Sequence, residues 1–228
     1  MEPVILISGA TRGIGFAAAA QLAARGARVI IGSRDLQRAK AAASSIGTDT
    51  FAIQLDITSA ASVAAALHTI EQRHSHLDVL VNNGAVILDH YEDLMLLSPE
   101  LLSETFATNV VGTLRLTQAM QPLLARSIMP RIINVSSSAG QLNGEIHAWA
   151  PAYCVSKTAL NMLTQQLSAA LPTMMINSMC PGWCRTEMGG IDAPLTAEEG
   201  ADTLVWLALD APGSLRGQFI KQREVIAW

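Results

Sequence analysis

A tyrosine and a lysine four residues apart form the pair in this chain best suited to acid–base chemistry. Tyr153 and Lys157 enclose Cys154, Val155 and Ser156, and on a helix this spacing places both side chains on one face. A free tyrosine has a pKa of about 10, and a nearby ammonium favours the phenolate and lowers that pKa. The pair could therefore exchange a proton with a substrate oxygen near neutral pH. The same spacing also occurs where a partly buried tyrosine lies beside a solvated lysine without catalytic role. Other segments of the chain must therefore distinguish the two interpretations.

A glycine-rich turn near the start of the chain is suited to binding a pyrophosphate. Its residues are Gly9, Ala10, Thr11, Arg12, Gly13, Ile14 and Gly15. The turn lies between an apolar run at residues 4–7 and an Ala-rich helical segment. Glycines in this context let the backbone approach the phosphates, and the helix N-terminus supplies free N–H groups. The spacing is Gly-xxx-Gly-x-Gly rather than the commoner Gly-x-Gly-xx-Gly, but the context predicts a dinucleotide site.

The residues after the second predicted strand bear on which dinucleotide would bind. NAD-binding proteins commonly place an acid there that hydrogen-bonds the adenosine ribose, whereas this chain has Ser33, followed by Arg34 and Asp35. Arg12 in the glycine turn can converge on the same point, and two guanidinium groups match a 2′-phosphate. This pattern favours NADPH/NADP, with Arg12 and Arg34 as ligands. In the alternative, Arg34 is a solvated loop residue and Asp35 binds the ribose of NAD.

Strand-like and helix-like segments alternate along the whole chain and would position these residues. Strands are expected at 4–7, 29–31, 51–55, 79–81, 132–135, 175–179 and 218–220. Helices are expected at about 14–25, 36–46, 60–74, 100–125, from the Tyr153 segment to about 170, and at 197–209. This order predicts an α/β fold, a doubly wound parallel sheet (Rossmann-type) of about seven strands with helices on both faces. Without a repeat or linker, residues 1–228 are expected to form a single dinucleotide-binding and catalytic domain.

The composition argues against several other classes of protein. Half of the 228 residues are hydrophobic and 15% are charged, which allows a sizeable core. The net charge of −4 and the absence of a Lys/Arg run argue against nucleic-acid binding. We find no apolar stretch of membrane-spanning length and no signal-peptide pattern, so a cytoplasmic enzyme is expected. Cys154, Cys180 and Cys184 follow no disulfide or metal pattern, and no metal site is expected.

Seven segments, in the same order along the chain, resemble the short-chain dehydrogenases/reductases, and most closely the carbonyl reductases. They are residues 9–15, 56–57, 82–83, 108–113, 134–137, the Tyr153/Lys157 pair and residues 180–186; the C-terminal residues 217–220 and the final tryptophan agree. The resemblance implies hydride transfer from NADPH to a ketone or aldehyde, with Tyr153 as the general acid. It implies that Lys157 lowers the tyrosine pKa and holds the nicotinamide ribose, and that Ser137 hydrogen-bonds the carbonyl oxygen. Asn109 would order a water molecule that connects Lys157 to solvent; otherwise it is a buried asparagine bonding backbone.

The resemblance also implies which residues contact the cofactor. Asp56 and Ile57 would meet the adenine, Asn83 the adenosine-side ribose region, and Thr186 the carboxamide. The full expected set is Gly9, Arg12, Gly13, Ile14, Gly15, Arg34, Asp56, Ile57, Asn83, Tyr153, Lys157, Pro181, Gly182 and Thr186. The chain departs from the family where Asn-Asn-Ala-Gly is common, because Gly84-Ala85 stands in place of Ala-Gly. Alanine lacks the conformational freedom of glycine, so this loop's contact with the cofactor is in question.

Apolar side chains in two loops suggest the substrate class. Leu142, Trp149, Trp183 and Met188 could form an apolar wall near the reacting carbon, which favours a hydrophobic ketone or aldehyde. Alternatively, the two tryptophans are packing residues of their loops.

The length of the segment before Tyr153 bears on the oligomeric state of the protein. Some monomeric carbonyl reductases carry a long insertion before the tyrosine, but only residues 138–152 separate Ser137 from Tyr153 here. The outer faces of two long helices are therefore free, and a homo-oligomer, a dimer or tetramer, is expected. The alternatives in function are an NAD-dependent alcohol or hydroxysteroid dehydrogenase and a non-catalytic NADP-binding sensor.

Overall fold

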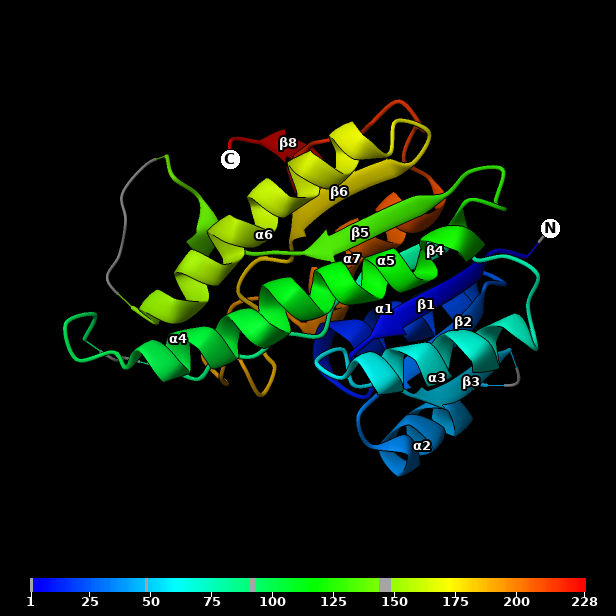
Figure 1. Cartoon of the computed structure of the whole chain (residues 1–228), viewed down its shortest axis with the longest axis horizontal. Helices are drawn as coiled ribbons and strands as arrows, with labels where there is room; N and C mark the ends of the chain where they lie inside the picture. Colours follow the sequence, from blue (N-terminus) through cyan, green and yellow to red (C-terminus); the bar gives the residue numbers. More distant parts are fainter. Residues whose placement is uncertain (1, 48, 91–92, 144–148) are drawn as a thin grey trace.

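Eight strands in the described part of the chain form one sheet. The structure is a computed structural model and describes residues 2–47, 49–90, 93–143 and 149–228. The strands are β1 Val4–Ser8, β2 Arg28–Ser33, β3 Thr50–Gln54, β4 Val79–Asn82, β5 Arg131–Val135, β6 Met175–Cys180, β7 Phe219–Lys221 and β8 Glu224–Ile226. The α-helices are α1 Gly13–Ala24, α2 Leu36–Ile46, α3 Ala60–Glu71, α4 Pro99–Phe106, α5 Thr113–Leu124, α6 Pro151–Ala170 and α7 Ala197–Leu209 (Figure 1). A π-helical turn, η1 Ala107–Gly112, and a 3₁₀ turn, η2 Ser138–Gly140, complete the list.

The sheet has the order β3-β2-β1-β4-β5-β6-β7-β8, and all of its pairs are parallel except β7 with β8. The predicted doubly wound sheet is therefore confirmed, with one strand more than expected. The hairpin to β8 turns at Gln222 and Arg223, which both have positive φ. Such turns normally carry Asn-Gly or Asp-Gly, so the sequence held no signal for this strand. The strand order reverses between β1 and β4, and sheets of this kind bind ligands at the carboxyl ends of the strands beside such a point.

Alternate residues of the strands face two separate hydrophobic cores. In β1, Ile5 and Ile7 pack with side chains of α1, α2 and α7, whereas Val4 and Leu6 pack with those of α3 and α5. Figure 1 shows α3, α5 and α6 running across the sheet. Burial on both faces explains why these strands read as continuous apolar runs. No helix in the described ranges is long and apolar enough to cross a membrane.

The long helix expected at residues 100–125 is interrupted. It consists of α4, η1 and α5, and the π-helical turn begins two residues before Asn109. Turns of this kind inside α-helices are often found at functional sites. The prediction of a long helix over about 100–125 is confirmed, with a π-helical turn in its middle that the sequence did not indicate.

A chain of buried polar side chains crosses the sheet beneath its carboxyl edge. Asn82 of β4 donates to Thr117 Oγ1 at 3.0 Å and to Asn134 Oδ1 of β5 at 2.8 Å. Asn134 donates to Thr164 Oγ1 of α6 at 2.8 Å, and Thr164 lies 2.8 Å from Ser178 Oγ of β6. This chain ties three strands to α5 and α6 immediately below the loops that carry the predicted site.

Candidate active site

The structure brings Ser137, Tyr153 and Lys157 together at the carboxyl edge of the sheet. Tyr153 and Lys157 lie in the first two turns of α6, both buried, and Lys157 Nζ is 5.4 Å from the centroid of the tyrosine ring. Lys157 Nζ donates to the carbonyl oxygen of Val135, at the end of β5, at 2.8 Å. Ser137 follows β5, and its side chain lies near enough to the phenol of Tyr153 to lower the pKa of that group. One strand end and one helix therefore fix all three groups.

The other two serines of this segment face elsewhere. Ser136 is buried, and its Oγ donates to the carbonyl oxygen of Lys157 at 3.4 Å. Ser138 is exposed, and its N–H donates to Cys180 Sγ at 3.2 Å. Of the three, Ser137 is thus the serine placed beside the phenol.

Burial dominates the protonation of the tyrosine and the lysine. Desolvation raises the pKa of Tyr153 above its ordinary value, and the nearby side chain of Ser137 lowers it by less. Desolvation also lowers the pKa of Lys157 to about 8. Burial thus raises the tyrosine pKa in the protein without cofactor, and the expected lowering by Lys157 stays a prediction. At neutral pH the phenol is protonated, which makes it available as an acid.

The lowered pKa of Lys157 predicts a rise in stability between about pH 8 and 9. Above pH 8 the folded protein has lost this proton while the unfolded chain, with a lysine pKa near 10.5, keeps it. The free energy of unfolding therefore increases with pH, by at most about 1.4 kcal/mol per pH unit. From about pH 9 upward the raised thiol pKa of Cys184, about 11, acts in the opposite direction. Urea unfolding at pH 7, 8 and 9 should show the rise, and Lys157→Met should remove it.

The matched control for this measurement is Lys40→Met, on the exposed face of α2. It should keep the rise. A flat profile in the wild-type protein, or a rise that persists in Lys157→Met, would contradict the prediction.

Asn109 in η1 is fully satisfied by hydrogen bonds and connects two segments. Its Oδ1 accepts from the N–H of Val86 at 2.9 Å, and its Nδ2 donates to the Val86 carbonyl at 3.0 Å. Nδ2 also donates to Ser156 Oγ at 3.0 Å, and Ser156 donates to the Tyr153 carbonyl at 2.7 Å. The side chain thus bonds the backbone of the loop after β4, as the alternative interpretation of this residue expected. The predicted role in ordering a water molecule stays a prediction.

The glycine turn leaves no space for side chains. Gly9 and Gly13 have φ of 67° and 56°, where an L-residue is strained. A Cβ on Gly15 would lie 2.5 Å from Asn83 Nδ2 and 2.8 Å from the carbonyl oxygen of Gly9. Asn83 Nδ2 donates to the carbonyl oxygens of Ser8 and Gly9, both at 3.0 Å, so this side chain supports the turn. Such a close-packed turn at the start of α1 fits a pyrophosphate held by backbone N–H groups.

The Gly84-Ala85 departure does not strain the backbone. Ala85 is not among the residues with positive φ, and Gly84 has no positive φ either. A Cβ on Gly9 would lie 2.9 Å from Gly84 Cα, so these two backbone segments are in close contact. The loop therefore needs no glycine at position 85.

Arginine side chains lie near the glycine turn, on the side that faces α2. Arg12 and Arg38 line a pocket of about 370 Å³ beside α1 and α2. Arg34 lies close enough to Asp56 to help lower the pKa of that carboxyl, although the hydrogen bonds from Thr58 contribute more. Sequence reasoning missed Arg38; its place four residues after Arg34 in a predicted helix was the available signal.

Asp35, the alternative ribose ligand, has another role. Its Oδ1 accepts from the N–H groups of Gln37 and Arg38 at 2.9 and 3.1 Å and caps α2. Arg12 forms an exposed ion pair with Glu187, close to where its predicted ligand would lie. One oxygen of the carboxylate at position 35 thus caps the helix, and the other forms an exposed ion pair with Arg38 at 3.4 Å.

The remaining predicted cofactor residues lie near the glycine turn and on the loop after β6. Ile57 is buried and packs against Gly112 of η1, where a Cβ would approach it to 2.8 Å. Thr186 lies against Gly13, within 3.2 Å of a Cβ placed there. Pro181 and Gly182 follow β6, and Gly182 has φ of 82°. Thr186 thereby connects the loop after β6 with the glycine turn.

Of the four predicted substrate residues, Trp149 lies next to the reactive pair. Its ring centroid is 6.1 Å from that of Tyr153. Trp183 is 58% exposed, and its Nε1 donates to the Gly189 carbonyl within its own loop. Leu142 and Met188 are also exposed, on the loops that follow β5 and β6. All four lie on loops that follow the carboxyl ends of strands or lead into α6.

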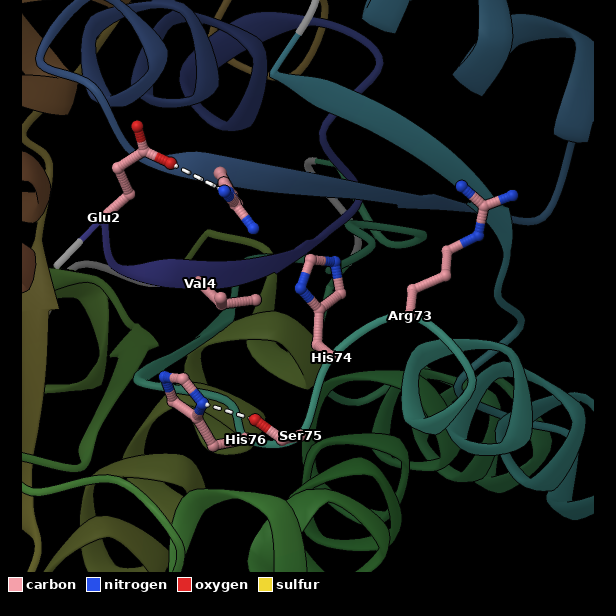
Figure 2. A pocket seen from close by; sticks show the side chains of 7 residues that line it. Glu2, Val4, Arg73, His74, Ser75 and His76 are labelled. Atoms are coloured by element: carbon pink, nitrogen blue, oxygen red, sulfur yellow. Dashed lines mark hydrogen bonds and ion pairs between the residues drawn. The ribbon is translucent and has the colours of Figure 1, made fainter.

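A second pocket, of about 460 Å³, lies at the opposite edge of the sheet (Figure 2). It is lined by Glu2, Val4, Arg28, Arg73, His74, Ser75 and His76. Within it, Arg28 pairs with Glu2 and His76 with Asp78. Since ligands of such sheets bind at the carboxyl ends of the strands, this pocket is not the active site. The described residues contain no group of three or more His, Cys, Asp or Glu that could hold a metal ion.

The chain is similar to known oxidoreductases over nearly its whole length. A family model described as short chain dehydrogenase matches residues 3–193. The chain is 30% identical over 267 residues to a (+)-neomenthol dehydrogenase of Arabidopsis thaliana, covering 90% of each protein. It is 30% identical over 278 residues to carbonyl reductase (NADPH) 1 of Sus scrofa, covering 99% of this chain and 94% of that protein. The structure of NADPH-bound carbonyl reductase from chicken fatty liver matches with a TM-score of 0.89 at 28% identity, covering 100% of both chains.

Proposed function

The chain belongs to the short-chain dehydrogenases, and on that premise we propose that it reduces a hydrophobic ketone or aldehyde to the alcohol with NADPH. One observation carries the proposal: a buried, protonated phenol at Tyr153 lies near the hydroxyl of Ser137 and above the amine of Lys157. We propose that residues 1–228 form one domain that binds the cofactor and catalyses. The carbonyl reductase and neomenthol dehydrogenase relatives support the substrate class.

In this mechanism NADPH, when bound, supplies the hydride, and the chain supplies the proton and the positioning. Tyr153 gives its proton to the carbonyl oxygen, and its raised pKa keeps the phenol protonated until then. Ser137 donates a hydrogen bond to the same oxygen as negative charge develops. Lys157, 5.4 Å from the ring centroid, favours the phenolate that remains. Its hydrogen bond to Val135 holds the ammonium in place.

The choice of NADPH over NADH rests on the cations around the glycine turn. Arg12, Arg34 and Arg38 can bind a 2′-phosphate, and Arg–phosphate contacts are strong and geometrically specific. Asp35 is engaged in capping α2, so its carboxylate is less available to a ribose. The glycine turn and Thr186 would hold the rest of the cofactor.

Arg34→Asp is expected to weaken NADPH binding on the order of 10²-fold while changing NADH affinity by only a few-fold. Hydrogen bonds between charged groups contribute about 1.5–3 kcal/mol, and the new carboxylate adds repulsion toward a phosphate. Fluorescence titration of both cofactors measures the two dissociation constants. Arg73→Asp, beside the pocket at the opposite edge, is the matched control and should leave both constants unchanged. Equal weakening of NADPH and NADH by Arg34→Asp would contradict the assignment.

A panel of carbonyl compounds assayed with both cofactors tests the proposed function directly. Purified protein should oxidise NADPH with hydrophobic ketones or aldehydes, and more slowly with carbonyl compounds that carry a carboxylate. Absence of NADPH oxidation with every carbonyl would refute the proposal. Turnover with NADH alone would instead favour the NAD-dependent alternative.

We also propose that the protein is a homo-oligomer, a dimer or tetramer. Val111 of η1 and Val155 and Met162 of α6 are large apolar side chains that are 45–56% exposed. These helices lie next to each other, and their outer faces offer apolar surface to a second copy. Sedimentation of the purified protein measures the assembly directly.

A further inference from the structure

Asp89, on the loop after β4, is a buried acid for which the proposed reaction has no use. Its side chain is fully buried, and its Oδ2 accepts a 2.5 Å hydrogen bond from the N–H of Ala152. Its Oδ1 is buried and has no hydrogen-bond partner among the described residues. Burying a carboxylate costs free energy unless hydrogen bonds offset the loss of water. Here the bond from Ala152, 63 positions away in the chain, offsets part of that cost. In the structure, the carboxylate of Asp89 therefore binds the start of α6.

The start of α6 has no cap of its own. Ala150, at the N-cap position, carries no side-chain acceptor and has φ of 41°, an unusual conformation for alanine. Pro151 has no N–H, so Ala152 presents the first N–H group of the helix that needs an acceptor. A carboxylate is a favourable acceptor at a helix N-terminus, because it also meets the positive end of the helix dipole. Asp89 takes the place that a local Ser, Thr or Asp normally occupies.

Tyr153 lies between two connections to the same loop. Immediately before it, Ala152 is held by Asp89. Three residues after it, Ser156 is held by Asn109, which also bonds both backbone groups of Val86. The loop segment from Val86 to Asp89 is therefore attached to the first two turns of α6, directly at Asp89 and through Asn109 at Val86. Loss of the bond to Asp89 would free the N-terminal end of α6, and Tyr153 with it.

We propose that Asp89 is a positioning residue for Tyr153: its carboxylate caps α6 from the loop after β4 and fixes the phenol beside Ser137. The proposal rests on the proposed function only for its effect on catalysis. Its effect on α6 can be measured without any turnover.

The test compares Asp89→Ala with Asp89→Asn. Asp89→Ala removes the acceptor and should lower kcat on the order of 10²-fold, the cost of a misplaced catalytic group, with the KM for NADPH unchanged. Amide hydrogen exchange of residues 152–157 should accelerate in the same variant, with α3 unchanged as an internal reference. Asp89→Asn keeps an oxygen acceptor and loses only the charge, so it should retain kcat within about fivefold.

Ser98→Ala is the matched control. Ser98 caps α4 through a bond from Ser98 Oγ to the N–H of Leu101 at 3.1 Å, so this variant also removes one helix cap. It should accelerate exchange at the start of α4 and leave kcat unchanged. If Asp89→Ala does not fold, Asp89→Ser replaces it and is judged by the same outcomes.

Two results in Asp89→Ala would overturn the proposal: wild-type exchange at residues 152–157, or faster exchange there with an unchanged kcat. A loss of kcat in Ser98→Ala as large as in Asp89→Ala would also overturn it. If the wild-type protein reduces no carbonyl compound, the proposed function fails, and the exchange rates alone still decide whether Asp89 holds α6.

Discussion

Tyr153→Phe is expected to lower the rate of carbonyl reduction by about 10²–10⁴-fold while cofactor binding is retained, because it removes the proposed proton donor. Phenylalanine keeps the ring that packs beside Trp149 and Lys157, so the shape of the site is preserved. Ser137 and Lys157 remain, but neither replaces the phenol as an acid in contact with the carbonyl oxygen. A single-turnover measurement of NADPH oxidation, with the dissociation constant of NADPH determined separately, distinguishes loss of chemistry from loss of binding.

Tyr91→Phe is the control, since the chain contains only two tyrosines. It should leave both the rate and the dissociation constant unchanged. The assignment of Tyr153 as the general acid would be refuted by a wild-type rate in Tyr153→Phe. A loss of NADPH binding in that variant, equal to the loss of rate, would assign the residue to the cofactor instead.

Gly15→Ala is expected to weaken NADPH binding by about tenfold or more and to destabilise the protein. The added Cβ would lie 2.5 Å from Asn83 Nδ2 and 2.8 Å from a backbone oxygen, so the turn or Asn83 must move. Overpacking of this kind costs about 1–3 kcal/mol, and 1.4 kcal/mol corresponds to a tenfold change in affinity. Displacement of Asn83 would also break its two bonds to the turn. Thermal unfolding and cofactor titration measure the two effects.

Gly213→Ala provides the matched control, because a Cβ at Gly213 would meet no atom within 4 Å. Its melting temperature and NADPH affinity should equal those of the wild-type protein. Wild-type affinity in Gly15→Ala would show that the turn tolerates a side chain and that its close packing has no part in binding.

The parts of the site that could be predicted from sequence are those fixed by local pattern. The alternation of apolar runs with helical segments predicted the sheet, and α2 and α7 have the predicted bounds. The glycine spacing predicted a strand–turn–helix, and the Tyr153/Lys157 spacing placed two groups on one face of α6. In each case neighbours within a few positions determine the local structure.

The parts that could not be predicted depend on contacts between distant segments. The π-helical turn at η1 follows from bonds between Asn109 and Val86, 23 positions apart. The raised pKa of Tyr153 follows from burial, which the spacing of Tyr153 and Lys157 did not reveal. Asp89 carries no local signal at all, because the helix that it caps begins more than 60 positions later.

The buried amides and hydroxyls that join β4, β5 and β6 specify the register in which these strands pair during folding. A shift of β5 by one position would turn Asn134 to the other face of the sheet. Asn82 would then lose an acceptor and Thr164 a donor, both in a buried place without water to replace them. Purely apolar strands would tolerate such a slip far more easily, because one buried aliphatic side chain can replace another. The buried polar side chains therefore disfavour incorrect strand registers. They lie directly beneath Ser137, Tyr153 and Lys157, the residues whose relative positions the proposed reaction requires.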